Sequence, residues 1–156
     1  DMDISFLSSH IADKFLNSKI NYPKERTFLS QMIYYGKKLY LKEKLLPNKN
    51  DTITIGYSKQ DLTWAQENEL YIWKYFIENE LLYNTDSKLT RRFIDPSPFS
   101  KFYLEIDNKS PGRIGRWIGW QIVRSFMKKN PELKIEDLIF KPSEELFIKS
   151  GYKPKL

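Results

Sequence analysis

Apolar residues recur every three or four positions along most of this chain, and this spacing constrains the fold more than any other feature. Because an α-helix has 3.6 residues per turn, residues at this spacing line one face of a helix. The pattern predicts helices over residues 4–17, 27–45, 59–83, 86–93, 111–130, 134–140 and 143–150. The sequence therefore predicts a mainly α fold, with residues 1–156 forming one helical domain.

Local signals refine the ends of these predicted helices. Ser58, followed by Asp61, resembles a capping box and predicts the start of the longest helix. Ser110-Pro111 predicts another start, because serine caps helices and proline fits the first helical position. Residues 53–57 are expected to form a short connector. Residues 102–106 are expected to form at most one short strand.

Three glycines fall within the helix predicted after Ser110. Gly112, Gly115 and Gly119 are three and four positions apart, so they share one face of that helix. Glycine costs about 1 kcal/mol relative to alanine inside a helix. This cost indicates a packing or functional reason, such as the close approach of another backbone.

Composition excludes several classes of function. The chain has no cysteine, so disulfides, thiolate metal sites and a cysteine nucleophile are excluded. No apolar stretch reaches membrane-spanning length, and the first residues do not resemble a signal peptide. The net charge of +6 is spread along the chain, which favours a mildly basic surface over a nucleic-acid arm. An acidic partner, whether nucleic acid, anionic lipid or protein, stays open as the alternative.

Few side chains are suited to acid–base or metal chemistry. His10 is the only histidine, and we interpret it as a surface residue because no second strong ligand lies near it in sequence. Glu69 falls close to an apolar stripe and is expected to be buried and paired with an arginine. Arg113, Arg116 and Arg124 would either pair with Glu67 or Glu69 or hold an anionic ligand near a helix N-terminus.

Several longer segments carry a resemblance to a known family. They are residues 29–46 (LSQMIYYGKKLYLKEKLL), 55–64 (IGYSKQDLTW), 67–83 (ENELYIWKYFIENELLY), 92–123 (RFIDPSPFSKFYLEIDNKSPGRIGRWIGWQIV) and 149–155 (KSGYKPK). Together and in this order they resemble the GldB-type lipoproteins of gliding bacteria, from about residue 25 to the end of the chain. The resemblance implies a protein of the cell envelope, held by an N-terminal lipid on a cysteine. This chain is accordingly expected to be the C-terminal portion of a longer precursor.

GldB-type chains are also distantly similar to predicted zinc metallopeptidases with a His-Glu-x-x-His helix. In this resemblance Ser9 and Asp13 stand in place of the two histidines, His10 in place of the glutamate, and Tyr35 in place of the third ligand. Zinc sites need three good protein ligands. The resemblance thus implies a degenerate, metallopeptidase-like fold without the metal, and no cofactor is expected.

We therefore expect a non-enzymatic domain that supports gliding and type IX secretion through contacts with envelope proteins. The membrane would be reached only through the N-terminal lipid, and no nucleic acid would bind. Aromatic, basic and one acidic residue are the candidates for a contact surface or groove: Tyr34, Tyr35, Trp64, Glu69, Trp73, Arg92, Arg113, Trp117 and Trp120. The alternative is a metal-dependent or acid–base hydrolase related to the metallopeptidases.

Overall fold

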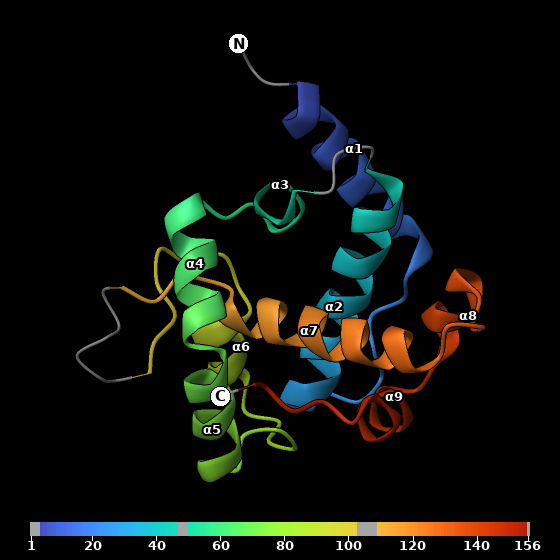
Figure 1. Ribbon diagram of the computed structural model, residues 1–156. Coiled ribbons are helices and arrows are strands. Elements are labelled where there is room, and N and C mark those ends of the chain that lie inside the picture. The colour runs from blue at the N-terminus through green and yellow to red at the C-terminus, as the bar shows by residue number, and fades with distance from the viewer. Residues whose placement is uncertain (1–3, 47–49, 103–108, 156) are drawn as a thin grey trace.

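Helices connected by short loops make up most of the protein in the computed structural model, which describes residues 4–46, 50–102 and 109–155 (Figure 1). The helices are α1 (Ile4–Lys19), α2 (Phe28–Leu45), α3 (Asp51–Ile55), α4 (Lys59–Glu67), α5 (Glu69–Glu78), α6 (Ser87–Phe93), α7 (Ile114–Lys129), α8 (Ile135–Phe140) and α9 (Ser143–Ser150). Over the described residues the only β pairing is one isolated bridge, between Phe99 and Pro111. The mainly α, single-domain prediction is confirmed.

The fold is centred on the crossing of α2 and α7, which Figure 1 shows near the middle of the molecule. A side chain on Gly119 would overlap the carbonyl oxygen of Met32, and one on Gly36 would overlap that of Gly119. The two backbones therefore touch at these glycines, which is the packing reason that the glycine spacing indicated. Gly115 has a similar role, because a side chain there would meet the carbonyl oxygen of Phe93.

The other helices surround this crossing. α1 packs on α2 and α3, and α9 packs on α7 and α2. One continuous core joins them, in which the Phe93 ring contacts the rings of Phe28, Phe76 and Phe102. Ring pairs at edge-to-face geometry add to the stabilisation from their buried area.

The single helix predicted over residues 59–83 is wrong, because two helices lie there. α4 ends at Glu67 and α5 begins at Glu69, and the residue between them, Asn68, adopts a non-helical φ of −108° and ψ of 10°. The Asn68 side-chain amide donates to the carbonyl of Trp64 at 2.8 Å, and such local bonds compete with the helical ladder. The start at Ser58 is confirmed, since its hydroxyl accepts from the Asp61 amide at 3.0 Å.

The helix start predicted at Ser110-Pro111 is also wrong. α7 begins at Ile114, after Arg113 in the left-handed region (φ 61°), and Gly112 lies outside the helix. Ser110 is buried and donates instead to the Ser100 carbonyl at 2.7 Å. The capping oxygen is the hydroxyl of Ser100, which accepts from the Ile114 amide at 3.2 Å. A serine does cap this helix, but it comes from ten residues further upstream.

Two further predictions concern the connecting segments. The connector expected at residues 53–57 largely falls within α3, a single helical turn capped by the Asn50 side chain and ended by Gly56 in the left-handed region. Of the strand expected at residues 102–106, only Phe102 lies within the described residues, where it is buried in the core.

Candidate functional site

A pocket of about 230 Å³ lies between α1, α2, α3 and the start of α7. We call it the basic pocket. Its lining residues are Asp13, Asn17, Tyr35, Lys38, Leu39, Lys42, Thr54, Ile55, Arg113 and Arg116. Four cations and one carboxylate line it, which gives a net charge of +3. Half of the chain's net charge of +6 is therefore concentrated around this one cavity.

Most of these cations are fixed by contacts within the protein. Lys42 pairs with Asp13 at 3.0 Å. Arg113 donates to the carbonyls of Ile55 and Gly56 at 2.8 and 3.2 Å. Burial lowers the pKa of Lys38, and the charge of nearby Arg116 lowers it further. Burial is the larger of these two effects, because it disfavours the charged form of the lysine.

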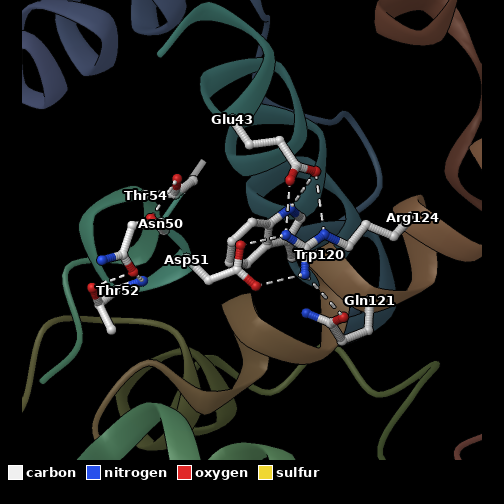
Figure 2. A network of polar contacts seen from close by, with 8 residues as sticks. All are labelled: Glu43, Asn50, Asp51, Thr52, Thr54, Trp120, Gln121 and Arg124. Atoms are coloured by element: carbon white, nitrogen blue, oxygen red, sulfur yellow. Dashed lines mark hydrogen bonds and ion pairs between the residues drawn. The ribbon is translucent and has the colours of Figure 1, made fainter. Parts of the chain in front are cut away.

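A second polar cluster joins α2, α3 and α7 around Arg124 (Figure 2). Its guanidinium donates to Glu43 at 2.8 Å and to Asp51 at 2.9 Å, and it lies 3.7 Å from the centre of the Trp120 ring. The Trp120 indole N–H also donates to Glu43, at 3.2 Å. Because Arg124, Glu43, Asp51 and the Trp120 N–H are bonded to one another across three helices, the role of this cluster is to hold those helices together.

This cluster corrects the ion pairs expected from the sequence. Arg124 pairs with Glu43 and Asp51, not with Glu67 or Glu69. Glu69 is half-buried and accepts from the Tyr152 hydroxyl at 2.6 Å. Burial raises the pKa of Glu69, whereas the bond from Tyr152 and the charge of Arg124 lower it. The true partners are distant in sequence, and no local spacing identifies them.

The predicted aromatic residues do not gather at one place. Tyr34 and Tyr35 contact each other edge-to-face on α2, and Tyr35 lines the basic pocket. Trp64 lines a shallow hollow on α4. Trp73 packs against Phe147 and Tyr152 near the end of the chain. Of the predicted aromatic residues, only Tyr35 therefore contributes a ring to the basic pocket.

The remaining predicted residues divide between the core, a loop contact and the pocket. Trp117 is 2% exposed and Trp120 is 0% exposed, so neither lies at a surface. Arg92 donates to the Lys101 carbonyl at 2.9 Å and to the Tyr75 hydroxyl at 2.9 Å. Arg113 lines the basic pocket, and so does Arg116, which the sequence predicted either to form an ion pair or to hold an anionic ligand.

The positions aligned with the metallopeptidase motif have other contacts here. His10 is exposed, in agreement with its interpretation as a surface residue. Ser9 is buried and donates to the Ile53 carbonyl at 3.3 Å, and Asp13 pairs with Lys42. Within residues 4–46, 50–102 and 109–155, no three His, Cys, Asp or Glu side chains form a group that could hold a metal ion.

The sequence reasoning missed an exposed apolar groove between α1, the end of α2 and α8. It encloses about 470 Å³, and its lining residues are Phe15, Leu16, Lys19, Leu41, Lys44, Leu45, Ile135, Glu136, Ile139 and Phe140. Phe140 is 81% exposed, Leu45 54% and Phe15 51%. Exposed apolar residues that gather in one place mark an interaction site more often than scattered ones do.

These features define a class: a mainly α, single-domain protein with a cation-rich pocket and a separate apolar groove on its surface. Within that class, the chain belongs to the family whose model, GldB_lipo, is described as gliding motility protein GldB and matches residues 1–154. The match extends further towards the N-terminus than the segments that carried the resemblance. Membership implies a role in gliding motility, and the family label denotes lipoproteins.

The family is not a known enzyme family. No curated protein and no solved structure matches the chain. In the described part of the chain, none of the helices has the length and apolar character needed to cross a bilayer.

Proposed function

We propose that this chain is a non-enzymatic domain of the cell envelope that supports gliding motility and type IX secretion by binding a partner protein. The family match supports a role in gliding motility. The observation that carries the proposal is the apolar groove between α1, α2 and α8, with its exposed phenylalanines and aliphatic side chains. Large apolar side chains at a concave surface are the residues that dominate protein–protein binding.

The charges around the groove define the partner that fits it. Lys19 and Lys44 line the groove with a single acid, Glu136. A partner segment could bury its apolar side chains in the groove, and acidic residues beside them could pair with the two lysines. Many grooves between helices bind an amphipathic helix in this way. We therefore assign the groove to an acidic, amphipathic segment of another protein of the gliding machinery.

The polar residues support contact rather than catalysis as the role of the chain. The half-buried carboxylates near the centre of the fold are used within the protein: Glu43 and Asp51 hold Arg124, and Glu69 accepts from Tyr152. A catalytic acid or base needs a carboxylate within reach of a substrate. Each of these three carboxylates instead bonds to a side chain from another part of the protein.

The test places a photocrosslinking residue at position 140 in gliding cells, with position 77 as the matched control. Ile77 is also an exposed large apolar residue, but it lies on α5, outside the groove. We expect crosslinks to one discrete protein from position 140 and none from position 77. Phe140→Glu is expected to weaken that complex at least about tenfold and to stop gliding, whereas Ile77→Glu leaves both intact.

Other outcomes would overturn the proposal. Crosslinks from position 140 to lipid alone would make the groove a membrane contact. Normal gliding of Phe140→Glu cells that retain the protein would exclude the groove from the function. Stoichiometric zinc in protein purified without chelators, together with peptide hydrolysis, would favour a metal-dependent hydrolase instead.

A further inference from the structure

The basic pocket holds positive charge that the protein itself does not neutralise. Among the described residues Asp13 is the only carboxylate that lines it, and both of its oxygens are about 3.0 Å from Lys42. Once this pair is formed, Lys38, Arg113 and Arg116 remain without a carboxylate among the described lining residues. Like charges held together in a partly desolvated cavity repel each other, so a bound anion would relieve the repulsion.

Two of these cations have hydrogen-bond donors to spare. The Lys38 ammonium makes no hydrogen bond to any described residue and lies 4.9 and 5.2 Å from the ring centres of Tyr34 and Tyr35. Arg116 uses its Nε atom to donate to the Ile94 carbonyl at 2.8 Å, and its guanidinium stacks over Tyr35 at 4.0 Å. Its terminal nitrogens donate to no described residue. These donors are available to a ligand.

The surrounding contacts hold these groups in place before a ligand arrives. Arg113 is fixed by the Ile55 and Gly56 carbonyls and lies over the Tyr57 ring. Burial lowers the pKa of Arg116, whereas the charge of Asp95, which does not line the pocket, raises it. Preorganised donors lose little entropy when they bind an anion.

We propose that the basic pocket binds a phosphate ester, with Lys38 and Arg116 donating hydrogen bonds to the phosphate oxygens. A net charge of +3 matches a phosphate better than a singly charged carboxylate, and a phosphate accepts from donors on several sides. The volume of about 230 Å³ leaves room beyond the phosphate itself. The Tyr35 ring, Leu39 and Ile55 provide an apolar wall for the carbon atoms of the ester.

The experiment titrates the purified chain with inorganic phosphate, with glycerol 3-phosphate and with vesicles of phosphatidylglycerol or phosphatidylcholine. Calorimetry and backbone amide shifts measure the binding. We expect glycerol 3-phosphate to bind saturably, with shifts at α2 and at the start of α7. Lys38→Gln and Arg116→Gln are each expected to weaken it about tenfold, whereas Lys74→Gln, an exposed lysine of α5, leaves it within about twofold.

A variant with the opposite effect separates binding from structural damage. Asp13→Asn removes the one carboxylate of the pocket and frees Lys42, so it is expected to tighten binding several-fold. Lys38→Gln tests the site even if Arg116→Gln fails to fold, because Lys38 donates no hydrogen bond to any described residue.

The vesicles distinguish the source of the phosphate. Binding of phosphatidylglycerol vesicles that the Lys38 variant loses would identify a lipid headgroup, and binding of glycerol 3-phosphate alone would identify a soluble ester. Binding of no phosphate compound, or equal binding by wild type and Lys38→Gln, would overturn the proposal.

Discussion

At the scale of single residues, the most important side chains are those that form ion pairs with residues far away in the sequence. Arg124 binds Glu43, 81 residues away, and Asp51, 73 residues away. The sequence identified the arginine as an ion-pair candidate but assigned it the wrong carboxylates. Spacing along a helix predicts neighbours three or four residues apart, whereas these contacts depend on how α2, α3 and α7 pack.

We predict that Arg124→Lys destabilises the protein by about 1–2 kcal/mol. Lysine keeps the charge but cannot donate to Glu43 and Asp51 from a planar fork, nor stack on Trp120 as a guanidinium does. Urea unfolding followed by circular dichroism measures the change. Arg91→Lys, on the exposed side of α6, is the matched control and is expected to be neutral. If Arg124→Lys and Arg91→Lys were equally stable, the planar guanidinium of Arg124 would contribute nothing measurable to the stability of the protein.

At the scale of whole elements, helix positions were predictable and helix ends were less so. Apolar spacing indicated α1, α2, α6, α8 and α9 to within a few residues. It could not indicate the break at Asn68, because the apolar stripe continues through it from Ala65 to Ile72. The start of α7 depends on Ser100, which the fold brings beside Ile114. A cap contributed by another loop leaves no local pattern in the sequence.

The candidate site was predictable to a smaller extent than the helices. Tyr35 and Arg113 were expected at a contact surface, and both line the basic pocket. Lys38 and Arg116 complete it only because α2 and the start of α7 meet there. The apolar groove was missed for a related reason: the residues that line it lie on three helices, and in each helix they resemble part of an ordinary buried face.

The crossing of α2 and α7 is the contact between elements most sensitive to added volume. We predict that Gly119→Ala destabilises the protein by about 2 kcal/mol, even though alanine favours helix by about 1 kcal/mol. The new methyl group would overlap the Met32 carbonyl, which is backbone and can move only if α2 moves. Thermal unfolding measures the loss. Lys128→Ala, at an exposed position of α7, controls for helix propensity and is expected to be nearly neutral.

A different result would change the description of this crossing. If Gly119→Ala were as stable as the wild type, α2 and α7 could move apart without loss of stability. The glycine spacing would then need a functional explanation in place of packing.

At the scale of the whole molecule, α2 connects the two proposed sites. Tyr35 and Lys38 of α2 line the basic pocket, and Leu41 and Leu45 line the apolar groove. α1 contributes to both in the same way, through Asp13 and Phe15. Because one helix pair forms a wall of each site, a partner that tilts α1 against α2 would alter both. The basic pocket and the apolar groove therefore share walls formed by α1 and α2.

Lys37 ties α8, the third wall of the groove, to α2, and it makes the stability of the whole molecule depend on pH. Its side chain is mostly buried, with 7% of the residue exposed, and its ammonium donates to the carbonyls of Lys141 and Ile139 at 2.6 and 3.4 Å. Burial lowers the pKa of Lys37 from 10.5 to about 8. Between these two values the unfolded chain binds more protons than the folded chain, so raising the pH stabilises the fold. Below pH 8 both states are protonated and this contribution is constant.

We therefore predict that the free energy of unfolding, measured as wild type minus Lys37→Met, rises by about 1–2 kcal/mol between pH 8 and 10. The full shift would correspond to more, but the ammonium keeps some contact with solvent, which weakens the effect. Taking the difference from Lys37→Met cancels the titration of the other lysines, because both proteins share it. Urea unfolding at intervals across this range measures it, and Lys74→Met, which removes an exposed lysine, should reproduce the pH dependence of the wild type. If the free energies of unfolding of wild type and Lys37→Met changed in parallel with pH, Lys37 would have the same pKa in the folded and the unfolded chain. Its burial against α8 would then cost no free energy.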